Sequence, residues 1–299
     1  MATTSDLKIA LVGDSVLDDH YWLDRPANDV RAQTERTLKL AYPDRSIRVD
    51  NFAVDESTVR SVLHGHAPRA HFRNGRTIAN MEPYPMDEDG IVRPLRLLRK
   101  AKPTHVVLSI GGNDARIRFL ESRNPDVIVD LMITDGFVDN LRRLVETIRA
   151  EITPNIILVY VYMPEFKAVP LLYMLPPARI LQRLLVNFSK FFVELAVEFR
   201  LPIIDLSRTF DPNNKSHYGS TPIEPSNVSG QFIADLLSKV LAQFQFGQEA
   251  GGKIFSGVGD DFRVEELDPH ALRTFSYERE LQAFLDRKKA EKPGTCAIA

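Results

Sequence analysis

The sequence predicts an α/β protein in which a mostly parallel sheet is covered by helices on both faces. Short apolar runs rich in β-branched residues alternate with longer segments whose apolar residues recur every three or four positions. The first pattern is typical of buried strands and the second of amphipathic helices. Strands joined through helices run parallel, because each connection must cross over a face of the sheet. The expected architecture is therefore a three-layer sandwich.

The elements follow one another in a regular order. The run THVVLSI at 104–110 is the clearest strand, and it stops at Gly111-Gly112. Two segments, 64–99 and 165–177, break the alternation and are expected to overhang the ends of the strands. Strands are predicted at 7–12, 47–54, 104–110, 155–163 and 202–206, and helices at 30–41, 136–152, 178–199 and 226–244.

The composition changes after Phe246, where the segment GQEAGGKIFSGVGDD is rich in glycine. A charged stretch at 277–289 then has a helical pattern. We therefore expect one domain at 1–245 and a C-terminal extension at 246–299.

Composition and charge exclude several classes of protein. The formal net charge is −2, and no basic block is long enough to follow a phosphate backbone, so no nucleic-acid partner is expected. The chain has no apolar run of about 18 residues and no secretory signal pattern at its start, which predicts a cytoplasmic protein. A single cysteine excludes an internal disulfide framework and a cysteine-based metal cluster.

Polar and glycine residues follow three predicted strands at the point where each ends. Asp14-Ser15 follows the first, Asn51 the second and Gly112-Asn113 the third. Ligands of open α/β sheets bind at the carboxyl ends of the strands, so these residues are candidates for one site. A serine hydroxyl needs a base to become a nucleophile, and an amide such as that of Asn113 can donate to a developing oxyanion. Read alone, Asp14 and Ser15 also fit a helix cap, and Asn51 and Asn113 fit turn positions.

The order Gly13-Asp14-Ser15, Asn51, Gly111-Gly112-Asn113-Asp114 resembles the successive motifs of the SGNH, or GDSL-type, hydrolases over residues 7–243. The resemblance implies a flavodoxin-like three-layer sandwich and an acyl-ester hydrolase that needs no cofactor. Ser15 would be the nucleophile, and its backbone N–H and the turn after Asn51 would add donors to the Asn113 amide in the oxyanion hole, where Gly112 allows close backbone approach. Ala53 stands where the resemblance predicts a glycine.

The general base is the point at which the chain departs from this pattern. Members of the family carry Asp-x-x-His before the last helix, whereas alignment on Asn227 and Gly230 puts Pro222 and Pro225 at these positions. Glu224 is the preferred substitute, with His217 as the alternative. The remaining candidates come from the 64–99 segment, namely His64, His66 and His71.

The chain ends in Cys296-Ala-Ile-Ala, which matches a prenylation signal. A lipid on Cys296, together with the basic residues Arg287, Lys288, Lys289 and Lys292, predicts peripheral contact with the cytosolic face of a membrane.

The sequence thus favours a serine esterase or lipase-like enzyme that acts on a small-molecule or lipid ester. The alternative is a catalytically inactive SGNH-fold protein that binds a ligand or docks at a membrane. Acyl transfer to an acceptor other than water is a third possibility.

Overall fold

A seven-stranded sheet forms the centre of the computed structural model, which describes residues 6–67, 84–122, 124, 127–169, 178–267 and 276–291. The strand order is β2-β1-β3-β4-β5-β6-β7, and all neighbours are parallel except β6 and β7. The strands are β1 (Leu7–Gly13), β2 (Ile47–Asn51), β3 (His105–Ser109), β4 (Ile156–Tyr160), β5 (Pro202–Asp205), β6 (Gly252–Ser256) and β7 (Arg263–Leu267). The predicted mostly parallel α/β sheet is confirmed.

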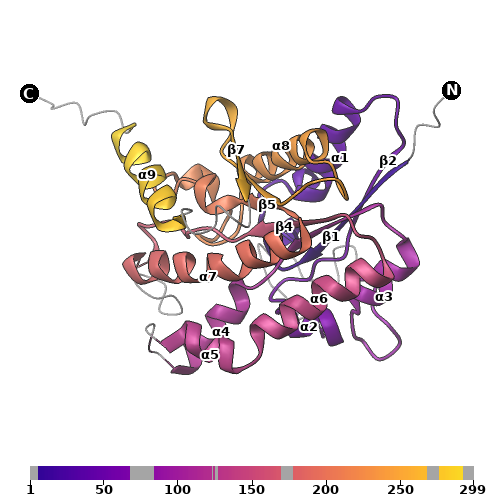
Figure 1. Cartoon of the computed structure of the whole chain (residues 1–299), viewed down its shortest axis with the longest axis horizontal. Helices are drawn as coiled ribbons and strands as arrows, with labels where there is room; N and C mark the ends of the chain where they lie inside the picture. Colours follow the sequence, from indigo (N-terminus) through magenta and orange to yellow (C-terminus); the bar gives the residue numbers. More distant parts are fainter. Residues whose placement is uncertain are drawn as a thin grey trace, which may run out of the picture.

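Helices cover both faces of this sheet, as Figure 1 shows with α1 and α8 on one side and α2, α3 and α6 on the other. The main helices are α1 (Val30–Ala41), α2 (Val59–His64), α3 (Pro94–Ala101), α4 (Gly112–Ser122), α5 (Ile128–Thr134), α6 (Phe137–Glu151), α7 (Ala178–Phe199), α8 (Asn227–Gln243) and α9 (Tyr277–Ala290). The expected three layers are present. No helix of the described ranges is long and apolar enough to cross a membrane.

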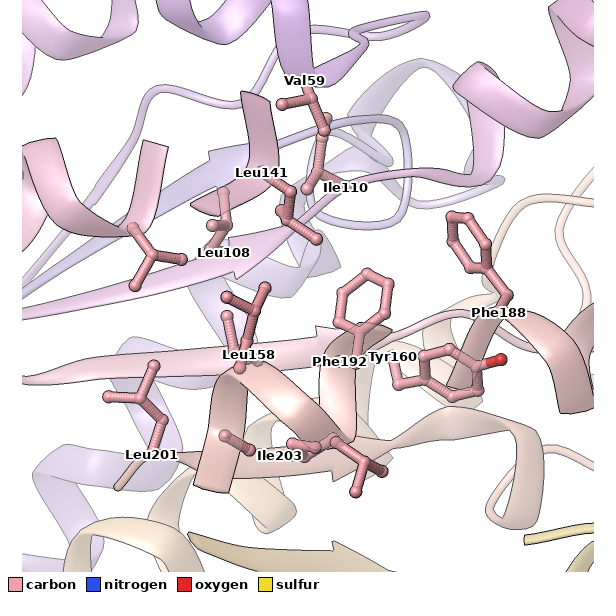
Figure 2. Packing of buried hydrophobic residues seen from close by; sticks show 14 of the residues in the cluster. Val59, Leu108, Ile110, Leu141, Leu158, Tyr160, Phe188, Phe192, Leu201 and Ile203 are labelled. Atoms are coloured by element: carbon pink, nitrogen blue, oxygen red, sulfur yellow. The ribbon is translucent and has the colours of Figure 1, made fainter. Parts of the chain in front are cut away.

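The central strands are buried on both faces of the sheet. Two separate apolar clusters, one on each face, therefore hold the three layers together. In β1, Ile9 and Leu11 belong to the cluster under α1 and α8, whereas Ala10 and Val12 belong to the cluster under α6 and α7. Figure 2 shows the second cluster, in which Leu108, Leu158 and Ile203 come from three successive strands and Leu141 and Phe192 pack nearby. The period of two along each strand therefore fixes which side chains face which helices.

The C-terminal part of the chain is more closely integrated than the sequence analysis predicts. The strands β6 and β7 lie within 246–299 and extend the central sheet beyond β5. The helix α9 is attached to the end of β5, where the buried carboxylate of Asp205 accepts a hydrogen bond from the Tyr277 hydroxyl at 3.2 Å. The same carboxylate accepts bonds from the Ser207 hydroxyl at 2.6 Å and from Arg208 Nε at 2.6 Å. Residues on both sides of position 246 therefore belong to one sheet, since β6 pairs with β5 and contributes Ile254 and Phe255 to the two apolar clusters.

Several helices lie where the periodicity does not predict a helix. The 64–99 segment includes the start of α3, and 112–134 holds α4 and α5. Residues 68–83 and 170–177, which include His71 and much of the 165–177 insertion, lie outside the described residues.

A single glycine controls how closely β1 and β3 approach at their carboxyl ends. Gly13 has φ +136°, and a Cβ there would lie 1.6 Å from the carbonyl oxygen of Ser109. Side chains other than glycine are strained in this backbone region, and the contact with a carbonyl group cannot relax without moving a central strand.

We predict that Gly13→Ala lowers the free energy of unfolding by about 3 kcal/mol or more, because strain and a backbone clash combine. Gly90→Ala is the matched control, since Gly90 also has positive φ, at +75°, but no atom lies within 4 Å of the point that a Cβ would occupy there. That change should cost only about 1 kcal/mol. Urea denaturation measures both values, and equal stabilities of the two variants would contradict the prediction.

Candidate active site

A cavity of about 380 Å³ opens at the carboxyl ends of β1, β3 and β4. Its walls come from the turn after β1, the start of α4, the segment after β4, the loop before α8, and the helices α5 and α7. The polar lining residues include Ser15, Asn113 and Glu224. Three segments that lie far apart in the chain therefore contribute polar groups to one cavity.

Ser15 lies in the turn that follows β1 directly, and it is half-buried in the cavity wall. The turn is held by backbone bonds from Leu17 and Asp18 to the carbonyl oxygen of Asp14, at 3.1 and 3.0 Å. The Asp14 N–H donates to the carbonyl oxygen of Ser109 in β3, at 3.1 Å. The position of Ser15 is thus fixed to both central strands.

Gly112 and Asn113 begin α4 just after β3 and line the same cavity. The side-chain nitrogen of Asn113 donates to the carbonyl oxygen of Ser57 at 3.1 Å. An amide nitrogen carries two hydrogens, so this bond orients the group and leaves a second donor. Donors at a helix start suit a developing negative charge, as the helix dipole adds to them.

Asn51 has a structural position rather than a place in the cavity lining. Its side-chain nitrogen donates to the carbonyl oxygen of Leu17 at 3.0 Å, and its oxygen accepts from the Ala53 N–H at 3.0 Å. These bonds tie the end of β2 to the chain just after Ser15. The structure therefore does not bring Asn51 together with Asn113.

The loop before α8 presents Glu224 to the cavity, together with Thr221, Pro222 and Ile223. Pro225 is buried outside the lining, so the cavity-facing position is one residue earlier than the sequence alignment places it. The hydroxyl oxygen of Thr221 accepts from the Glu224 N–H at 3.2 Å and fixes the local turn. Glu224 is the acidic residue that this loop contributes to the cavity wall.

Tyr162 connects this loop to the end of β4. Its hydroxyl donates to the carbonyl oxygen of Ile223 at 2.5 Å, and its ring lines the cavity. Burial, and next the Glu224 carboxylate, raise the pKa of Tyr162 well above its ordinary value. The hydroxyl therefore stays protonated and holds the loop as a donor.

None of the histidines in the described part of the chain lines the cavity. His217 accepts the Asp211 N–H on Nδ1 at 2.9 Å, and its ring packs edge-on against Phe232 with centroids 5.2 Å apart. Burial lowers its pKa. His64 ends α2, and the backbone of His66 pairs with Val92. The structure thus separates His217, His64 and His66 from Ser15.

Two buried carboxyl groups, Asp14 and Asp55, lie in the cavity wall, and only Asp14 was singled out in the sequence. Asp14 accepts the Val16 N–H and the Ser109 hydroxyl, each at 3.2 Å. Burial raises the pKa of Asp14 to about 7, and the charges of Asp55 and Asp114 act in the same direction. The adjacent apolar strand was the only sequence signal that Asp14 would be buried.

The far side of the cavity is apolar. It is formed by the α5 residues Ile128 and Met132 and by the α7 residues Leu181, Leu184, Leu185 and Phe188. Within the described residues, no group of three or more His, Cys, Asp or Glu side chains is arranged to hold a metal ion. Cys296 lies outside the described residues.

No protein-family model matches this sequence. No curated protein matches it either.

The fold, in contrast, resembles several solved structures. A lipase from a goat rumen metagenome superposes with a TM-score of 0.55 at 14% identity, covering 81% of this chain and 99% of that one. A protein described as a GDSL-like lipase from Parabacteroides merdae gives 0.51 at 15% identity, covering 80% and 96%. A lipase/acylhydrolase from Enterococcus faecalis gives 0.50 at 22% identity, covering 81% and 100%. The chain has the fold of the SGNH, or GDSL-type, hydrolases, as its sequence motifs predict.

The buried carboxyl groups near the cavity predict how stability depends on pH. Burial raises the pKa of Asp18 to about 7, although the Tyr84 hydroxyl and the Asp55 N–H donate to it at 2.5 and 2.8 Å. The folded state therefore holds a proton that the unfolded chain loses near pH 4, so this contribution to stability is complete below pH 4 and is lost as the pH rises to about 7.

We predict that Asp18→Asn reduces the fall in unfolding free energy between pH 4 and pH 7, because the amide cannot ionise and its oxygen still accepts both bonds. Urea denaturation across this pH range measures the slope. Asp44→Asn, at an exposed position, is the control and should keep the wild-type profile. A slope unchanged in Asp18→Asn would contradict the assignment.

Proposed function

We propose that this protein is a carboxylic ester hydrolase that acts through Ser15. The observation that carries the proposal is that Ser15, Gly112, Asn113 and Glu224 line one cavity at the carboxyl ends of the parallel strands. The lipases and the lipase/acylhydrolase with the same fold support the same reaction class.

In this mechanism the Ser15 hydroxyl oxygen attacks the ester carbonyl carbon, and Glu224 accepts the hydroxyl proton. The Asn113 amide and the Gly112 N–H donate to the oxyanion of the tetrahedral intermediate. When the intermediate collapses, the bond to the leaving oxygen breaks, and the proton passes from Glu224 to that oxygen. Water then attacks the acyl-Ser15 carbonyl carbon and gives a proton to Glu224. As the bond to the Ser15 oxygen breaks, Glu224 passes this proton to that oxygen, which releases the acid and restores the Ser15 hydroxyl and the Glu224 carboxylate.

A carboxylate in place of histidine is a weaker base in water, but its surroundings change its strength. Apolar neighbours and nearby carboxyl groups both favour the protonated form of a carboxyl group, which makes the carboxylate a better proton acceptor. The loop that carries Glu224 has such neighbours, since Ile223, Trp22 and Asp14 line the same cavity. Glu224 is preferred to His217 because only Glu224 faces this space.

The second candidate function is ligand binding without catalysis. The absence of a histidine from the cavity lining within the described residues favours it. A cavity with a buried polar end and an apolar side would still bind an acyl compound. Activation of the serine distinguishes the two functions.

A fluorophosphonate probe tests this directly. We expect labelling of the wild-type protein, none of Ser15→Ala, and at least about a 100-fold slower rate in Glu224→Gln, since a general base contributes 10²–10⁴-fold. His217→Ala, which removes a ring outside the cavity, should label at the wild-type rate. Detection of the labelled peptide by mass spectrometry identifies the site. An unlabelled wild-type protein would refute the enzyme proposal, and equal rates for wild type and Glu224→Gln would refute the base.

Prenylation is a separate proposal that comes from the sequence alone. If Cys296 carries a lipid, expression in eukaryotic cells should move the protein into the detergent phase, and Cys296→Ser should abolish this shift. Intact-mass measurement shows the modification. An unmodified Cys296 in the wild-type protein would end the proposal of a membrane anchor.

A further inference from the structure

We infer that the apolar side of the cavity binds the acyl chain of the substrate, and that this chain is a hydrocarbon of several carbons rather than an acetyl group. This inference rests on the proposed function, which supplies the position of the ester carbonyl group. It adds the identity of the acyl group and the direction in which it extends.

The apolar wall is part of the folded core. Ile128, Met132, Leu185 and Phe188 are almost fully buried and belong to the cluster that covers one face of the sheet. Leu181 and Leu184 are partly buried and pack against the same cluster. A wall whose side chains are fixed by core packing is preformed for a hydrocarbon ligand.

This wall begins directly beside the groups proposed to bind the oxyanion. The ring of Phe188 packs so closely on Gly111 that a Cβ there would lie 2.8 Å from a ring carbon. Gly111 immediately precedes Gly112 and Asn113. When Asn113 binds the ester carbonyl group, the first methylene groups of the acyl chain therefore lie within reach of the α7 side chains.

The position of the base determines which half of the ester meets this wall. Glu224 lies just before α8, and α8 packs on the sheet face that is also covered by α1. The residues of α5 and α7 that line the cavity belong to the cluster on the opposite face. Because Glu224 must give its proton to the leaving oxygen, the alcohol half points toward the loop before α8. The acyl half then points toward α5 and α7.

The chemistry of the wall and the size of the cavity indicate the length of the chain. The six side chains from α5 and α7 are hydrocarbons or a thioether and offer no strong hydrogen bond. The charged lining groups Glu56 and Arg116 form an ion pair at 3.4 Å. A volume of about 380 Å³ lies in the range of sites for small organic ligands, so an acetyl group would leave most of it unfilled.

Hydrolysis of p-nitrophenyl esters of increasing acyl length tests the inference, with Ser15→Ala as background. Each methylene buried from water should raise kcat/KM roughly fourfold, so octanoyl should exceed acetyl by at least about 100-fold. Leu184→Trp fills the wall and should lower the octanoyl-to-acetyl ratio at least tenfold. Ile180→Trp, on the same helix but outside the cavity lining, is the matched control and should keep the wild-type ratio.

A binding measurement that needs no turnover separates this inference from the proposed function. In Ser15→Ala protein labelled with methyl-¹³C methionine, octanamide should shift the signal of Met132, assigned with Met132→Leu, and acetamide should not. A shift together with octanoyl preference supports the inference. Ser15-dependent hydrolysis that favours acetyl, with no shift, overturns it and leaves the proposed function intact. A shift without any ester hydrolysis keeps the alkyl site and refutes the proposed function.

Discussion

The close approach of β1 and β3 at Gly13 is the constraint on which the site depends. Without a side chain at this position, the Asp14 N–H reaches the Ser109 carbonyl oxygen, and the Ser109 hydroxyl reaches the Asp14 carboxylate. The two strands are thus joined in both directions just where each one ends. Ser15 follows one strand and Asn113 the other, so their separation is set by the sheet rather than by a loop.

Those parts of the fold that depend on local pattern were predictable from the sequence. The central strands are buried on both faces and appear as continuous apolar runs, and α6 has a clear apolar stripe. The strands β6 and β7 were missed because β6 lies in a glycine-rich stretch and β7 is charged and mostly exposed, with only Leu267 buried. The short helices α4 and α5 were missed because their apolar residues face a cavity and a neighbouring helix, which gives no regular stripe.

The candidate site also has residues that were predictable from the sequence and residues that were not. Ser15, Gly112 and Asn113 were predictable because chain order and strand ends are enough to bring them to one edge. The positions of Asn51 and His217 were not predictable from strand ends. Their bonds to Leu17 and Asp211 depend on the paths of loops. The burial of Asp55 results from packing of distant segments, which no local pattern records.

Several carboxyl groups lie in the wall of this cavity or close to it. Asp14, Asp55 and Glu224 line it together, and Asp18 lies buried behind them. Several carboxyl groups in one poorly solvated region cannot all be ionised at low cost, so their protonation states depend on one another. The protonation state of Asp14 therefore depends on the acids around it as well as on its own burial.

The pairing of β5 with β6 also determines where this protein can be shortened. A fragment that stops near residue 245 would expose the full edge of β5, whose four residues are all buried in the complete chain. It would also remove Tyr277 from Asp205 and Glu265 from Arg208. An open edge of this kind pairs readily with other chains, so such a fragment would aggregate although every proposed catalytic group is present.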